Sequence, residues 1–487
     1  MISLKISALD CTIRSGMVKF IYPGQRRGYM KQTKTGDEVF RSMPVPQAVR
    51  TMAMPAVISQ LIVLIYNLAD TYFIGQTNNP TMVAGVSLIL PVFNLTLAFG
   101  GLFGIGGGAL IPKLLAQNDN DEAGRVAADC VRLGALVALA FSVILLLFMR
   151  PILFALGASD ATLAHARIYV LMVLVIGGIP TVLNNILSNL IRSLGLSREA
   201  GIAVALGGVL NIFLDPLFMF VLLPRGNEVL GVGIATLLSN IISCIYCLVI
   251  YFKKQSVIRS GFTLPAPRAD SRRAVITVGV PGSVGTLLFD IDYMVLDKLV
   301  AAYGDTALAA IGIVLKAERF PQQVGIGLCQ GMVPLVAYSY AIGDYPRIRK
   351  IMAATLKAGL TVALVSVTIY ELFTKQIIWL FIRDAETIAI GTEFLRVRSI
   401  AAVIMFFCFF VVFLYQGLGD GKRSLLLAVL RWACLNIPML FLLNHILGMY
   451  GLVWAQVISD VLTVIISYAI LHHSMKGWPV SAGKELP

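Results

Sequence analysis

Residues 55–76 read PAVISQLIVLIYNLADTYFIGQ, an apolar stretch in which Asp70 is the only charged side chain. A helix rises about 1.5 Å per residue, so about 20 apolar residues cross the hydrocarbon core of a bilayer. Such a run must be helical in lipid, because an open strand would leave its backbone groups without hydrogen bonds. The stretch therefore predicts a membrane-spanning helix that carries an ionisable group.

The same pattern recurs through the 487 residues, of which 58% are hydrophobic and only 13% are charged. Soluble domains carry about 25% charged residues, so this composition excludes an ordinary soluble enzyme. We predict an all-α polytopic membrane protein with twelve transmembrane helices. Their expected ranges are 50–76, 82–112, 124–149, 163–191, 199–223, 231–252, 273–297, 306–338, 348–373, 388–416, 424–444 and 450–471.

The formal net charge of +13 has an explanation other than nucleic-acid binding, because Lys and Arg gather in cytoplasmic loops. With the N-terminus inside, the inner segments hold 26 of these residues and the outer loops hold 5. We therefore predict a multi-pass protein of the plasma (inner) membrane with both termini in the cytoplasm. Its partners are expected to be bilayer lipid and small molecules, without nucleic acid, and the chain is expected to be a monomer.

A basic linker at 253–272 follows the sixth apolar segment and divides the chain into two lobes of six helices. We define the N-lobe as residues 45–252 and the C-lobe as residues 273–475. The remaining segments, 1–44 and 476–487, are predicted to be cytoplasmic tails.

The two lobes also resemble each other in sequence. GVGIATLLSN at 231–240 matches GLVWAQVISD at 451–460, and the first apolar segment of each lobe carries an aspartate, Asp70 and Asp297. Six helices per repeat is an even number, so both repeats have the same orientation. The two bundles should therefore be related by a pseudo-two-fold axis along the membrane normal, as in many secondary transporters.

Ionisable groups at membrane depth are costly and indicate function. Asp70, Asp215 and Thr236 are expected at a similar depth in the N-lobe, and Asn211 lies one helical turn before Asp215. Oxygen ligands of this kind suit a proton or a hard cation such as Na⁺. The alternative is that Asp70 caps the end of its helix and faces water.

In the C-lobe, acids and amides cluster in the seventh and eighth apolar segments. Lys316 and Glu318 could neutralise each other, pair with the nearby aspartates, or bind substrate. We expect at least one of the acids to face a central cleft. The candidate cleft residues are Asp290, Asp292, Glu318, Gln322, Tyr66 and Asn67.

Motifs of other function classes are missing from the apolar segments. None contains His-Glu-x-x-His, Gly-x-Ser-x-Gly or a Walker motif, so we predict that the protein is not an enzyme and uses no cofactor. The glycine run at 100–109 is interpreted as a helix-packing surface, and Cys244 and Cys247 as packing residues. No metal is expected beyond Na⁺ at Asp70 and Asp215.

Taken in order, these segments resemble the MATE (multidrug and toxic compound extrusion) transporters over about residues 45–472. The resemblance rests on PAVISQLIVLIYNLADTYFIGQ, IRSLGLS, NIFLDP, GVGIAT and LKAERFPQQVGIGLCQGMVPLVAYSYAIGD. The last of these is most similar to the MepA-like bacterial branch. The resemblance implies that entry of H⁺ or Na⁺ drives export of organic cations through a cleft that opens alternately to each side.

The resemblance also implies individual roles. Asp70 matches the aspartate of the family's first helix, and Thr236 matches the threonine of its sixth. Asn211 and Asp215 match the asparagine–aspartate pair of the fifth helix. The asparagine of the fourth helix has three candidates, which are Asn184, Asn185 and Asn189.

Two alternative functions remain open. A lipid-linked saccharide flippase of a related superfamily branch would share this architecture, but such proteins commonly have more spans or a strongly cationic cleft. A membrane-embedded transferase would need clustered acids to hold a metal–diphosphate, and Asp290-x-Asp292 is the only such hint.

Overall fold

The computed structural model describes residues 38–77, 79–253, 258, 261 and 264–478. These residues form helices and no strand. Among them, eleven helices are long and apolar enough to cross a membrane, and one bent pair of helices supplies a twelfth span. The predicted all-α membrane fold is therefore confirmed, whereas most of both predicted tails lies outside the described residues.

Short helices and π-helical turns interrupt several spans of the N-lobe. Its elements are η1 (Glu38–Ser42), α4 (Val45–Gly75), α5 (Pro80–Ser87), α6 (Leu90–Ala116), α7 (Asn120–Leu147), α8 (Met149–Ala155), α9 (Asp160–Val170), η2 (Leu171–Ile176), α10 (Gly178–Ser193), α11 (Ser197–Pro216), η3 (Leu217–Leu222) and α12 (Glu228–Lys253).

The C-lobe begins with four long helices, of which α15 is kinked at Phe373. Its elements are α13 (Ala269–Ala301), α14 (Asp305–Ala341), α15 (Tyr345–Phe381), α16 (Ala385–Leu418), α17 (Gly421–Val429), η4 (Leu430–Asn436), α18 (Ile437–Leu447) and α19 (Met449–Met475). Helix α13 starts inside the segment that the sequence predicted as linker. The sequence analysis missed this start because the first turns of α13 are charged rather than apolar.

Polar residues between the apolar segments act as helix N-caps. The side chains of Asp119, Asp344, Asp384 and Asp420 each accept a hydrogen bond from the backbone N–H three residues later. Such a cap satisfies a backbone donor that has no partner within its own helix. These capping aspartates therefore set where α7, α15, α16 and α17 begin.

The fourth span is broken rather than straight. The α9–η2 segment and α10 meet at a bend of 48° beside Gly177. A Cβ at this glycine would lie 2.6 Å from the Val173 carbonyl oxygen, so only glycine fits there. The sequence predicted one continuous span, because hydropathy does not report a bend.

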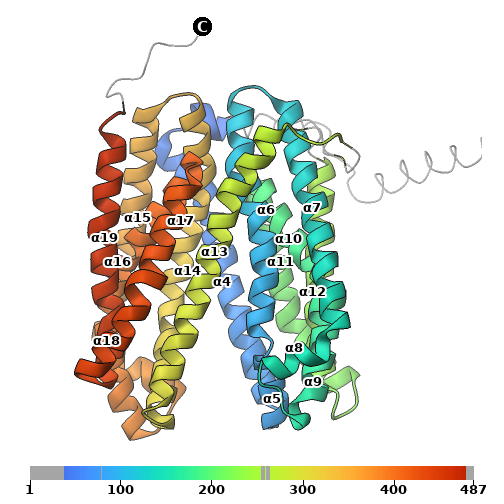
Figure 1. Cartoon of the computed structure of the whole chain (residues 1–487), viewed down its shortest axis with the longest axis vertical. Helices are drawn as coiled ribbons and strands as arrows, with labels where there is room; N and C mark the ends of the chain where they lie inside the picture. Colours follow the sequence, from blue (N-terminus) through green and yellow to red (C-terminus); the bar gives the residue numbers. More distant parts are fainter. Residues whose placement is uncertain (1–37, 78, 254–257, 259–260, 262–263, 479–487) are drawn as a thin grey trace, which may run out of the picture.

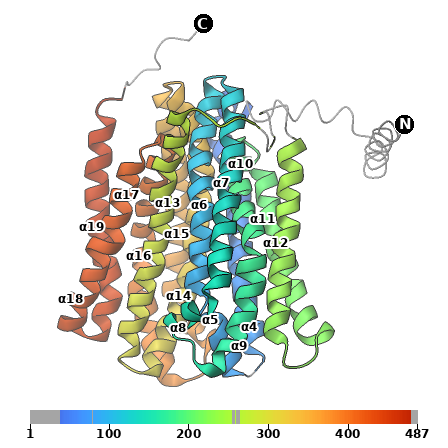
Figure 2. The same ribbon diagram turned by 45° about the vertical axis from the view of Figure 1, so that its right-hand side comes forward.

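The two lobes stand side by side, with the N-lobe in blue to green and the C-lobe in yellow to red (Figures 1 and 2). We call the end that carries η1, the start of α15 and the end of α19 the terminal end. In Figure 1 the ribbons of the two lobes lie close together in the terminal half and diverge toward the opposite end.

Glycines allow two helix pairs to cross between the lobes in the terminal half. A Cβ on Gly279 of α13 would lie 1.8 Å from the Leu102 carbonyl oxygen of α6. A Cβ on Gly331 of α14 would lie 2.5 Å from the Ala53 Cα of α4. Because only glycine permits so close an approach, these residues determine the contact between the lobes.

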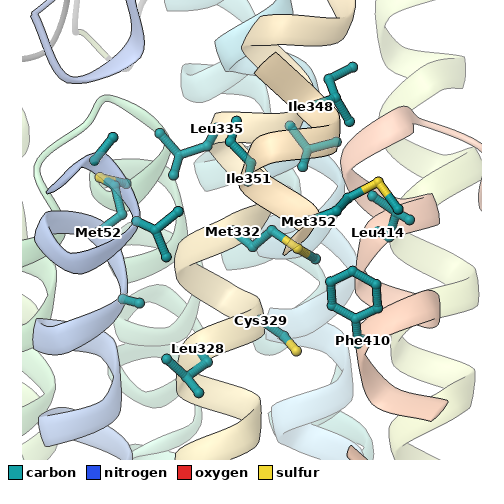
Figure 3. Close-up of a cluster of buried hydrophobic side chains, with 14 of the residues drawn as sticks. Met52, Leu328, Cys329, Met332, Leu335, Ile348, Ile351, Met352, Phe410 and Leu414 are labelled. Atoms are coloured by element: carbon teal, nitrogen blue, oxygen red, sulfur yellow. The ribbon is translucent and has the colours of Figure 1, made fainter. Parts of the chain in front are cut away.

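An apolar core lies around the second of these crossings and joins the lobes. Met52 of α4 belongs to the same buried cluster as Met332 of α14, Ile351 of α15 and Phe410 of α16, as Figure 3 shows. Phe40 of η1 is also buried in it. The terminal half is therefore closed by packed side chains from both lobes.

Candidate ion-coupling and substrate sites

A polar cluster lies inside the N-lobe between α4, α11 and α12. The Asn211 side-chain amide donates to Asp215 Oδ1 at 3.1 Å and reaches Thr236 Oγ1 at 3.4 Å. Asp215 is fully buried, with 0% of its surface exposed. Asn211 therefore contacts both Asp215 and Thr236, two other residues that were predicted to form the coupling site.

Asp70 of α4 completes this cluster. Its carboxyl group lies within hydrogen-bonding distance of the Asp215 carboxyl group. Asp70 Oδ1 and Asp215 Oδ2 are buried and accept no hydrogen bond from any residue that the structure describes. Two carboxylates this close repel each other unless a proton or another cation lies between them. The arrangement is therefore suited to binding a cation.

Two tyrosines lie beside these carboxyl groups. Tyr66 packs against α11, where a Cβ on Gly208 would lie 3.0 Å from its ring. Tyr169 of α9 is buried and lies within electrostatic range of Asp70 and Asp215. The sequence analysis missed Tyr169, because a tyrosine in an apolar segment more often marks the membrane interface.

Asn185 of α10 makes its contacts elsewhere. Its amide donates to the Leu97 carbonyl oxygen at 3.3 Å, and its Oδ1 accepts from Asn189 at 3.0 Å. Another candidate, Asn184, accepts from Ser243 at 3.0 Å. Among the described residues, no hydrogen bond joins these asparagines to Asp70 or Asp215.

Glu318 forms an ion pair inside the C-lobe, with a partner that the sequence analysis did not name. Glu318 is 3% exposed and accepts two hydrogen bonds from Arg398 of α16, at 2.7 and 2.9 Å. Lys316, the partner suggested by the sequence, is exposed. Both oxygens of the Glu318 carboxylate thus bind Arg398 within the lobe. Glu318 is therefore unsuited to bind a cation in a cleft.

Asp292 and Gln322 are also buried inside the C-lobe rather than lining a cleft. Asp292 accepts from the Asn436 amide at 2.7 and 2.8 Å, and Gln322 donates to Tyr293 Oη at 2.9 Å. The sequence expectation placed both in the cleft, because acids and amides disfavour a lipid-facing surface. Burial within the lobe satisfies that requirement equally well.

Asp290 is the acid that lies between the lobes. Its carboxylate is hydrogen-bonded to Asn94 of α6, and Arg319 of α14 lies within electrostatic range. Asn67, another predicted cleft residue, is exposed on α4. The structure therefore leaves Asp290 and Asn67 as the predicted cleft residues that are not enclosed within one lobe.

Comparison with known proteins agrees with the duplicated fold. The MatE family model matches residues 55–217 and 281–442, once in each lobe. The chain belongs to the MatE family. Multidrug export protein MepA of Staphylococcus aureus (strain MSSA476) is 27% identical over 433 residues, covering 89% of this chain and 95% of MepA.

Solved structures of MATE transporters have the same fold. An outward-facing multidrug resistance MATE transporter of the MOP superfamily gives a TM-score of 0.86 at 22% identity, covering 91% of this chain and 98% of its own. A mutant of the Vibrio cholerae MATE transporter VcmN gives a TM-score of 0.83 at 19% identity, with the same coverage. At these identities the likeness concerns the fold of this MatE-family chain.

Proposed function

We propose that this chain is a secondary active multidrug efflux transporter that exports organic cations in exchange for H⁺ or Na⁺. The observation that carries the proposal is the buried contact between Asp70 and Asp215, with Asn211 and Thr236 around it. The export activity of the MepA relatives supports it. It is proposed to need no cofactor and to act without catalysing a chemical reaction.

The coupling cation would act by relieving repulsion between the two carboxylates. With the site empty, Asp70 and Asp215 repel each other across the contact between α4 and α11. Binding H⁺ or Na⁺ removes that repulsion and lets the two helices pack more tightly. Since α4 also packs on α14 of the other lobe, a movement of α4 reaches the lobe interface.

The closed terminal half suggests which state the structure represents. We place the terminal end in the cytoplasm, because Lys and Arg are concentrated in the segments assigned to that side. The lobes then meet on the cytoplasmic side and diverge toward the outside (Figure 1). This is the arrangement of an outward-facing transporter in the plasma membrane, and we propose that it works as a monomer.

Organic cations are proposed as cargo because an acid, Asp290, lies at the lobe interface, beside Arg319. The bond between Asp290 and Asn94 is to a neutral amide. A cation that leaves water for this interface loses hydration, and a carboxylate compensates for that loss.

The test is transport of ethidium by the purified protein in proteoliposomes, with a proton gradient and a sodium gradient imposed separately. We expect accumulation with one gradient and its loss in Asp70→Asn and Asp215→Asn. A saccharide flippase would instead move a lipid-linked saccharide without moving ethidium. Ethidium transport that is independent of both gradients would contradict the coupling.

A further inference from the structure

The C-lobe contains a polar cluster at the position that corresponds to the N-lobe ion cluster in the internal repeat. LNI at 435–437 matches LNI at 210–212, so Asn436 corresponds to Asn211. In the matched segments of α12 and α19, Gln456 corresponds to Thr236.

The contacts support this correspondence. Asn436 donates to Asp292 and also to Gln456 Oε1 at 3.2 Å, just as Asn211 reaches Asp215 and Thr236. Asp292 lies on α13, the first helix of its lobe, as Asp70 does on α4. The structural counterpart of Asp70 is therefore Asp292, whereas Asp297, which the sequence analysis chose, is exposed.

The two clusters differ in their charged groups. Leu440 occupies the position of Asp215, and the second carboxylate of the C-lobe copy is instead Asp460, which corresponds to Asn240. The C-lobe copy also contains Arg431, whose counterpart in the N-lobe is Leu206. Arg431 binds Asp460 at 2.8 and 3.2 Å, and Gln456 donates to the same carboxylate at 2.9 Å.

Arg431 is buried, and its charge acts on Asp292. It is 2% exposed, and its guanidinium also lies 4.0 Å from the centre of the Trp432 ring. Arg431 and the Glu318-bound Arg398 are both within electrostatic range of Asp292. Among the described residues, no Lys or Arg forms an ion pair with Asp70 or Asp215.

We propose that Arg431 supplies the C-lobe cluster with a permanent, covalently attached cation in place of a mobile one. The C-lobe then binds no coupling ion, and every coupling ion binds at Asp70 and Asp215. A guanidinium stays charged at all physiological pH values and cannot leave, so it cannot drive a transport cycle. This inference rests on the proposed ion coupling.

The test counts ions bound by the purified full-length protein. One assay measures binding of ²²Na⁺, and a parallel assay measures protons released when tetraphenylphosphonium is added. We expect Asp292→Asn to bind or release as many ions as the wild type, and Asp70→Asn/Asp215→Asn to bind or release none. Asparagine keeps the shape of each carboxyl group, and size-exclusion chromatography checks that each variant is folded.

Ions remaining in the Asp70→Asn/Asp215→Asn protein, or a loss of ions in Asp292→Asn, would overturn the inference. The Asp70→Asn/Asp215→Asn measurement tests the inference with the C-lobe unchanged. A folded Arg431→Gln protein should gain one ion that a further Asp460→Asn change removes, and unchanged binding would also overturn it. If the wild type gave no response to either ion, the proposed coupling itself would be wrong, and this inference with it.

Discussion

At the scale of single residues, the N-lobe site depends on the buried carboxyl group of Asp215. It is fully buried, and one of its oxygens accepts no hydrogen bond from the described residues. Burying a charge without a partner is costly, so a carboxyl group in this setting needs a ligand. The remaining bond, from Asn211, orients the carboxyl group toward Asp70.

We expect Asp215→Asn to reduce ethidium efflux at least about tenfold, which corresponds to about 1.4 kcal/mol. Asparagine retains the oxygen that accepts from Asn211, so the protein should stay folded, but it can neither take up a proton nor attract a cation. Efflux from cells at matched expression measures this. Asp160→Asn, a change to an exposed aspartate at the start of α9, is the control and should transport normally.

Glu318 gives a different residue-scale prediction, because its partner is buried with it. Glu318→Gln leaves the Arg398 guanidinium without a counter-ion, which should destabilise the protein by about 3–5 kcal/mol. Thermal unfolding in detergent measures the loss. The double variant Glu318→Gln/Arg398→Gln should recover much of it, while Asp160→Asn at the exposed start of α9 should change little.

The contrary result for Glu318 would be informative. If Glu318→Gln were as stable as the wild type but lost resistance to cationic drugs alone, the carboxylate would belong to the substrate site after all. The structure disfavours this, because both oxygens of Glu318 already accept bonds from Arg398.

At the scale of helices, the sequence predicted the spans well and their interruptions poorly. Hydropathy records the length of an apolar run, so spans such as α4 and α12 could be found from composition alone. The bend at Gly177 and the π-helical turn after Pro216 depend on backbone hydrogen bonds, which hydropathy does not record. Their positions therefore emerged only from the structure.

Which residues pair between distant helices also could not be predicted from the sequence. Glu318 and Arg398 are separated by 80 residues, and Arg398 lies inside the predicted span 388–416, whose hydropathy gave no sign of a buried ion pair. The N-lobe cluster was easier, because Asn211 and Asp215 lie one turn apart and depth along each helix could be counted. Local spacing could thus be predicted, whereas distant partners could not.

The α6–α13 crossing gives a prediction at this scale. Gly279→Ala places a methyl group 1.8 Å from the Leu102 carbonyl oxygen, so the two helices must move apart. We expect transport to fall about tenfold or more, since the lobes can no longer close in the terminal half. Gly312→Ala in α14, where no atom lies within 4 Å of the added Cβ, should leave transport unchanged.

Both variants should insert and express alike, which Western blotting of membranes checks. Normal ethidium efflux by Gly279→Ala would mean that a close α6–α13 approach is dispensable. Reduced efflux by Gly312→Ala would instead point to a general cost of adding a methyl group to a helix glycine.

At the scale of the whole molecule, polar bonds reinforce the packed contact between the lobes. Lys113 of α6 donates to the Leu418 carbonyl oxygen of α16 at 2.7 Å. Arg272 of α13 binds Asp129 of α7 through two bonds of 2.9 Å. Each joins the N-lobe to the C-lobe near the terminal end, and each must break if that end opens during the cycle.

A disulfide across the lobe interface tests whether that opening is required. A Cβ on Gly101 of α6 would lie 3.3 Å from Ser283 Oγ of α13, a spacing compatible with disulfide geometry. We expect oxidised Gly101→Cys/Ser283→Cys to lose ethidium transport in proteoliposomes and dithiothreitol to restore it. The two single-cysteine variants, treated with the same oxidant, control for reactions of the native cysteines. Undiminished transport by fully cross-linked protein would show that α6 and α13 stay together as a pivot, so that alternating access would have to arise from other helices.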